Sequence, residues 1–140
     1  MYKKILSVGA LFGFFAVAIG AFGAHGLEDK IIASRITTFK TGVDYQFYHT
    51  FAIFLAVGLA AHYRDKLFLV AGWCFVIGIL FFSGSLYLLA TRSFLGIESW
   101  SKILGPITPL GGLFFLAGWG LILYGTLKKN RTVHLIPKNS

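Results

Sequence analysis

Four long apolar stretches, separated by short polar segments, dominate the hydrophobic pattern of the chain. They cover residues 5–24, 47–61, 67–90 and 103–127. A helix rises ~1.5 Å per residue and the hydrocarbon core of a bilayer is ~30 Å thick, so about 20 apolar residues cross it. The pattern therefore predicts an all-α integral membrane protein, a bundle of four transmembrane helices.

The start of the second span is predicted from a short polar motif. Thr41 and Asp44 have the spacing of a capping box, in which a hydroxyl and a carboxylate three residues apart satisfy backbone amides at a helix start. We therefore expect spans at about 5–24, 42–62, 67–90 and 103–127. These spans form one transmembrane domain, residues 1–127, followed by a cytoplasmic polar tail, residues 128–140.

The segment between the first two spans has an amphipathic pattern. Its apolar residues recur at three- and four-residue spacing, as on one face of a helix: Ile32, Ile36, Phe39 and Val43. This pattern predicts an interfacial amphipathic helix that lies in the outer membrane surface. Packing of the same face over the end of the bundle is an equally good interpretation.

The N-terminal stretch has features of a secretory signal peptide. Lys3 and Lys4 precede an apolar run that contains Ala16-Val17-Ala18. The run is longer than the ~7–15 apolar residues of such a signal. We therefore expect a true first span.

The net charge of +8 is best explained by membrane topology. In a soluble domain it would favour nucleic acid, but here only 13% of residues are charged and most bases flank the apolar stretches. With a cytoplasmic N-terminus, eight bases lie inside: Lys3, Lys4, Arg64, Lys66, Lys128, Lys129, Arg131 and Lys138. Five lie outside: Lys30, Arg35, Lys40, Arg92 and Lys102. The positive-inside rule thus predicts two cytoplasmic termini, and we expect no nucleic-acid partner.

Several polar residues fall inside or beside the spans, where polar groups are costly. The predicted topology places them towards the outer end of the bundle: His25, Asp44, Gln46, Tyr48, His49, Ser83, Ser85 and Thr108. Gln46 and His49 are three residues apart and so share one face of the second span. These residues are the candidate site.

Three interpretations of this cluster stay open. It can be a hydrogen-bonded structural cluster that sets the helix register, or a pocket for a small molecule or lipid head group. It can also be a metal or haem site that uses His25 and His49, although zinc would need a carboxylate such as Asp44 as well. The residues identify no cofactor. We find no hydrolase motif, phosphate loop or intramembrane pair of carboxylates, so an enzyme is not the favoured reading.

Four ordered motifs carry a resemblance to a known family. They are GAFGAHGL at residues 20–27, YQFYH at 45–49, FSGSLY at 82–87 and GPITPLGG at 105–112. Together they resemble the small bacterial membrane proteins called domain of unknown function 423, which are related to eukaryotic transmembrane protein 256. The resemblance covers about residues 1–127. It implies a four-span protein of the bacterial plasma (inner) membrane, and it implies no activity.

The leading functional hypothesis is a small non-enzymatic scaffold or accessory subunit. Its partners would be the lipid bilayer and either a second copy or another membrane protein, held through Gly-rich faces such as that of Gly9 and Gly13. The rival hypothesis is a ligand-binding or redox site on the His/Gln/Tyr cluster. A third is a transporter or channel component, which needs a continuous polar path.

Overall fold

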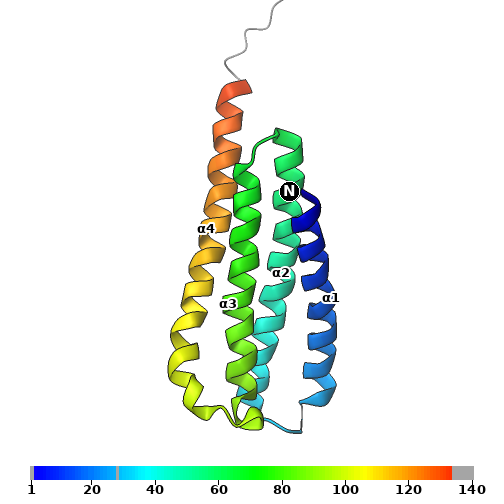
Figure 1. The fold of residues 1–140 in the computed structure, drawn as a ribbon, viewed down its shortest axis with the longest axis vertical. Helices are drawn as coiled ribbons and strands as arrows, with labels where there is room; N and C mark the ends of the chain where they lie inside the picture. Colours follow the sequence, from blue (N-terminus) through cyan, green and yellow to red (C-terminus); the bar gives the residue numbers. More distant parts are fainter. Residues whose placement is uncertain (1, 28, 134–140) are drawn as a thin grey trace, which may run out of the picture.

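The chain folds into long helices that run side by side (Figure 1). The computed structural model describes residues 2–27 and 29–133, with side chains as far as Lys128. The helices are α1 (Tyr2–Gly26), α2 (Ala33–Tyr63), α3 (Leu67–Leu95) and α4 (Ser101–Val133), and the short 3₁₀ helix η1 (Glu98–Trp100) precedes α4. The predicted all-α class is thus confirmed. The last residues of the predicted tail, 134–140, lie outside the described residues.

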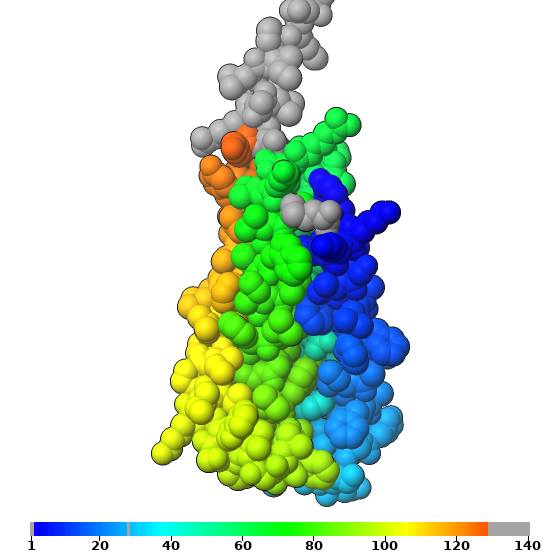
Figure 2. Space-filling view, in the orientation of Figure 1, coloured from blue at the N-terminus to red at the C-terminus, as the bar shows by residue number. Residues whose placement is uncertain are grey.

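The helices form an open row rather than a closed bundle. Helix α2 packs between α1 and α3, and α3 packs between α2 and α4. Within the described residues, α1 and α4 do not touch each other. Figure 2 shows α3, in green, exposed between α4 and α1 on one face of the molecule. Helices α1 and α4 are therefore the two edges of the row.

The two ends of the row differ in what they carry. The α1–α2 and α3–α4 connections lie at one end, here called the connection end (Figure 1). The N-terminus, the Arg64–Lys66 turn and the last turns of α4 lie at the other, here called the terminal end. The Tyr2 hydroxyl donates to the Ala60 carbonyl at 3.3 Å, which holds α1 beside the C-terminal part of α2.

Three stretches of helix are long and apolar enough to cross a membrane. They are Tyr2–Gly26, Leu67–Leu95 and Glu98–Lys128. Helix α2 is not among them, although it is 31 residues long. Its first turns are polar, and Gln46, His49 and Thr50 further lower its hydropathy. Three of the four predicted spans are thus supported by length and composition.

The amphipathic segment does not form a separate interfacial helix. It is the first part of α2, which is continuous from Ala33 to Tyr63. The capping box is also wrong, because the Thr41 hydroxyl donates to the Thr37 carbonyl at 3.0 Å inside the helix. Part of the apolar face packs within the row near the connection end, where Phe39 is buried with Leu27 and Ala90, whereas Ile32 is 66% exposed.

A ladder of Phe and Gly residues fixes α4 against α3. The phenylalanines of α3 and the glycines of α4 each recur every seven residues, the repeat of a left-handed helix pair. The opposed pairs are Phe68–Gly125, Phe75–Gly118 and Phe82–Gly111, with Gly78–Phe115 in the reverse sense. At Gly78, Gly118 and Gly125 the facing Phe ring occupies the space that a side chain would need, and at Gly111 the backbone and Cβ of Phe82 occupy it. This seam sets the register of α4 and so the position of its polar and aromatic residues.

Candidate functional site

Five of the eight predicted site residues gather at one level of the row. Gln46 and His49 on α2 and Ser83 and Ser85 on α3 are buried, and Thr108 on α4 is partly buried. The level lies between the middle of the row and the connection end, since His49 is the seventeenth of the 31 residues of α2 and Thr108 is the eighth of the 33 residues of α4. The continuation of α2 to Ala33 accounts for its distance from that end. The other three residues, His25, Asp44 and Tyr48, are exposed.

The structure does not bring His25 and His49 together. Gly13 faces Thr50 and Gly20 faces Val43 across the α1–α2 contact. His25 is therefore level with residues near 38 of α2, about 11 residues or roughly 16 Å along the axis from His49. Among the described residues, no group of three or more His, Cys, Asp or Glu side chains could hold a metal ion. This geometry does not support a metal or haem held by the two imidazoles.

Gln46 links three helices. Its Nε2 donates to the Phe12 carbonyl of α1 at 2.8 Å, and the Tyr87 hydroxyl of α3 donates to its Oε1 at 2.7 Å. The side chain is 3% exposed, so both bonds form away from solvent. Gly42, one turn before Gln46, leaves room for the Tyr87 ring, whose Cε1 lies 2.8 Å from where a Cβ would be. Sequence reasoning missed Tyr87, although it closes the FSGSLY motif.

His49 is held between α2 and α4 as a neutral ring. Its Nδ1 lies 2.8 Å from the Tyr45 carbonyl, which can only accept, so Nδ1 carries the proton. The unprotonated Nε2 then accepts from the Trp119 indole N–H at 3.4 Å. The ring also stacks on Phe115, with centroids 3.4 Å apart and planes 7° apart. Both nitrogens face protein partners, which leaves neither free for a metal.

This tautomer gives a direct prediction. Nitrogen NMR of His-labelled protein in detergent should show His49 with a protonated Nδ1 and an unprotonated Nε2. Trp119→Phe should shift the Nε2 resonance, because it removes the indole donor, and leave that of Nδ1 nearly unchanged. A His49 protonated at Nε2 would contradict the arrangement.

A hydroxyl pair joins α3 to α4 at the same level. The Ser85 and Thr108 hydroxyls are 2.7 Å apart, so one donates to the other, and the hydroxyl that accepts donates to a carbonyl of its own helix, that of Phe82 for Ser85 or of Leu104 for Thr108. The pair continues the α3–α4 ladder towards the connection end. Two buried hydroxyls, those of Ser83 and Thr50, have no hydrogen-bond partner among the described groups.

Two grooves lie on opposite faces of the row. The first, here called the α2/α4 groove, has a volume of about 380 Å³ and lies over Phe82 of α3. Its wall includes His49 and Trp119, and its full lining is Tyr45, His49, Phe82, Gly112, Phe115, Leu116 and Trp119. Of the eight predicted site residues, only His49 lines this groove, and its tyrosine is Tyr45, which was not predicted.

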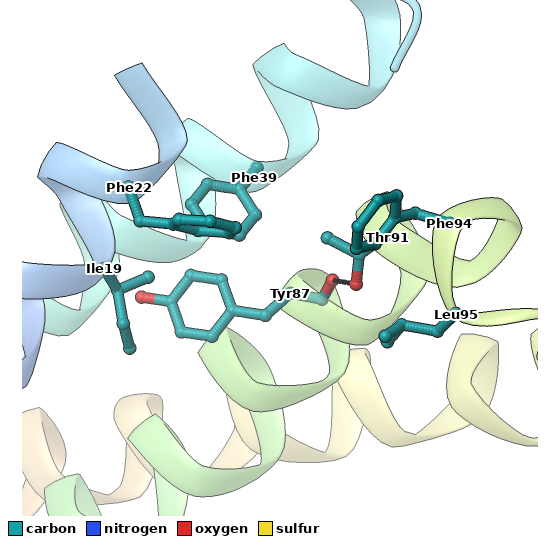
Figure 3. A pocket seen from close by; sticks show the side chains of 7 residues that line it. All are labelled: Ile19, Phe22, Phe39, Tyr87, Thr91, Phe94 and Leu95. Atoms are coloured by element: carbon teal, nitrogen blue, oxygen red, sulfur yellow. Dashed lines mark hydrogen bonds between the residues drawn. The ribbon is translucent and has the colours of Figure 1, made fainter. Parts of the chain in front are cut away.

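The second groove, here called the α1/α3 groove, consists of two adjoining hollows of about 260 and 210 Å³. They share Ile19 of α1 and Tyr87 of α3. Figure 3 shows the hollow nearer the connection end, with Phe22 and Phe39 on one side of the Tyr87 ring. Its lining is Ile19, Phe22, Phe39, Tyr87, Thr91, Phe94 and Leu95. Apart from two hydroxyls these side chains are apolar.

The fold and these apolar faces define a helical membrane protein. Comparison with known proteins agrees: residues 19–112 match the family described as "Protein of unknown function (DUF423)". A UPF0382 membrane protein of Haemophilus influenzae is 44% identical over 128 residues, which cover 91% of this chain and 97% of the relative. UPF0382 membrane protein YwdK of Bacillus subtilis is 40% identical, over 90% of this chain and 98% of the relative.

A further relative carries a location in its name. UPF0382 inner membrane protein YgdD of Escherichia coli is 38% identical over 92% of this chain and 93% of its own length. No solved structure matches the chain. The chain belongs to the DUF423 family of membrane proteins, to which the four motifs pointed.

Proposed function

We propose that this chain is a four-span protein of the bacterial inner membrane with both termini in the cytoplasm. Helix α2 would be the fourth span, because it lies between two helices that can each cross a membrane (Figure 1). Its polar residues Gln46, His49 and Thr50 are buried, so the low hydropathy of α2 need not face lipid. Within residues 2–133, seven Lys and Arg residues lie at the terminal end and five at the connection end.

Reporter fusions test this topology. Alkaline phosphatase inserted in the α1–α2 connection, after Lys30, should be active, whereas an insertion in the Arg64–Lys66 turn should be inactive. A fluorescent protein that folds only in the cytoplasm should give the opposite pattern. Equal phosphatase activity at the two sites would contradict a span formed by α2.

The function that the geometry supports best is a non-enzymatic scaffold or accessory subunit. The observation that carries this proposal is the open row, whose edge helices α1 and α4 have no contact with each other. Each edge presents bulky apolar side chains, among them Val17 at 63% and Leu116 at 69% exposure. Meanwhile Gln46 and the Ser85–Thr108 pair are used to join the helices. The polar level thus supports structure, and the outer faces remain for association.

Native mass spectrometry after gentle release from the membrane tests the scaffold proposal. A discrete species heavier than the chain by one protein mass is expected, either a second copy or another membrane protein. Leu116→Ser, on an exposed face of α4, should weaken that species, and Val70→Ser, on an exposed face of the inner helix α3, is the matched control. A bare chain under all release conditions would count against the proposal.

A second candidate function is the binding of a small apolar molecule in the α2/α4 groove. The space of about 380 Å³ is mostly apolar, and the His49, Tyr45 and Trp119 side chains supply its few polar groups. Small-molecule sites typically have this composition. A transporter is less well supported. From the polar level to the terminal end the core contains Ile53, Phe75 and Phe68, so the described residues offer no continuous polar path.

A further inference from the structure

We propose that the α1/α3 groove binds one acyl chain of an anionic phospholipid, with Lys30 at its mouth contacting the phosphate. This inference goes beyond the scaffold proposal, because it concerns the opposite face of the row from the α2/α4 groove and a lipid rather than a protein. Three observations carry it: the depth of the groove, the chemistry of its lining and the cation at its end.

The groove covers the depth of one membrane leaflet. On α1 its lining runs from Phe12 to Phe22, ten residues or about 15 Å along the axis. Half of a hydrocarbon core ~30 Å thick is the same length. The groove ends near the connection end, where Phe94 and Leu95 close the lining (Figure 3). It therefore matches an acyl chain that enters from the leaflet on that side.

The lining offers hydrocarbon contacts and almost no free hydrogen-bonding groups. The Tyr87 hydroxyl already donates to Gln46, and the Thr91 hydroxyl donates to the Tyr87 carbonyl at 2.8 Å. Gly84, midway along the α3 wall, has no atom within 4 Å of the position of a Cβ, so it leaves open space in the groove. Gln46 also lines the groove, but its amide already binds the Phe12 carbonyl and the Tyr87 hydroxyl. A flexible hydrocarbon chain therefore fits this lining better than a polar metabolite does.

A cation stands at the mouth of the groove. The Lys30 ammonium lies 5.7 Å from the ring centroid of Phe94, a lining residue. No described carboxylate lies within ion-pair distance of it, in contrast to Arg35 and Arg92, which both pair with Glu98. In the sequence, the segments near the connection end carry five bases and four acids: Lys30, Arg35, Lys40, Arg92 and Lys102 against Glu28, Asp29, Asp44 and Glu98. The Lys30 ammonium beside the groove favours an anionic head group over a zwitterionic one.

Native mass spectrometry with defined lipids tests the proposal. The purified protein is exchanged into mixed micelles that contain palmitoyl-oleoyl phosphatidylglycerol or the corresponding phosphatidylcholine. The expected result is one retained phosphatidylglycerol per chain, with phosphatidylcholine retained at least fivefold less. Lys30→Gln should remove about that fivefold preference, the size expected when one lysine beside anionic lipid is lost. Equal retention of the two lipids by the unchanged protein would overturn the role of Lys30.

A groove-filling variant tests the position of the acyl chain. Gly84→Leu places a side chain in the open part of the groove and should reduce retention of either lipid at least tenfold. Gly58→Leu is the matched control, since Gly58 on α2 also has no atom within 4 Å of a Cβ position and lines neither groove. Circular dichroism should show both variants folded. If folded Gly84→Leu retained phosphatidylglycerol as well as Gly58→Leu did, the acyl-chain site would be refuted. Displacement of the lipid by a protein of discrete mass would refute it equally.

Discussion

Gly111→Ala is expected to lower the thermal stability of the protein more than any other single methyl addition along the α3–α4 ladder. At Gly111 the two helix backbones meet, and an added Cβ would overlap the backbone nitrogen and Cα of Phe82. A ring can rotate away from a new methyl group, but a helix backbone can relieve this overlap only if α4 moves. Overpacking costs typically ~1–3 kcal/mol, and we expect the upper end here. Thermal unfolding in detergent, followed by near-UV circular dichroism, measures the effect.

The neighbouring glycine supplies the control. A Cβ at Gly112 would find its nearest neighbour, a ring carbon of Phe82, at 4.0 Å. Gly112→Ala should therefore leave the melting temperature unchanged or raise it slightly, because Ala favours a helix over Gly by up to ~1 kcal/mol. Equal melting temperatures for the two variants would show that the α3–α4 contact is not as close as described.

Gln46→Leu is expected to have the second-largest effect. It leaves the partly buried Tyr87 hydroxyl without its acceptor and removes the hydrogen bond to the Phe12 carbonyl. Interhelical hydrogen bonds in membrane proteins are worth ~0.6 kcal/mol on average and up to ~1.7 kcal/mol, so losing two should cost about 1–3 kcal/mol. Tyr87→Phe should cost less, and the double variant should cost less than the sum, because the pair shares one bond. Unfolding titrations in mixed detergent micelles measure all three.

Tyr124→Phe is the control for this series. Its side chain is 59% exposed and removal of its hydroxyl should change the stability by less than ~0.5 kcal/mol. Strict additivity of Gln46→Leu and Tyr87→Phe would contradict the bond between Gln46 and Tyr87.

Hydropathy alone predicted most of the fold. The α1, α3 and α4 spans are uniformly apolar, and their positions follow from composition. The extent of α2 was harder to predict, because Gly42 and a polar segment before it look like a helix boundary. In the structure Gly42 lies inside the helix, where the Tyr87 ring takes the space of a side chain. Only a tertiary contact explains that glycine, so local sequence signals could not place it.

The candidate site was predicted in part. Helical spacing correctly placed Gln46 and His49 on buried positions of α2. Their partners Tyr87 and Trp119 were missed, because which residues of α3 and α4 face them depends on the register that the Phe–Gly ladder sets. The seven-residue repeat of that ladder is visible in the sequence and could have given the register. His25 was grouped with His49 because the second span was expected to begin at 42, nine residues after the observed start of α2.

Site-specific photocross-linking in native membranes tests whether the open row associates with another protein through its edge helices. A benzoyl-phenylalanine replaces Leu116 on the exposed face of α4 or, as a control, the buried Val76 of α3. If the edges associate, position 116 should give a single protein adduct of discrete mass and position 76 should give none. The same experiment is done with the photoreactive residue at Val17, on the other edge. If positions 116 and 17 both gave only lipid adducts, association through the edges would be refuted.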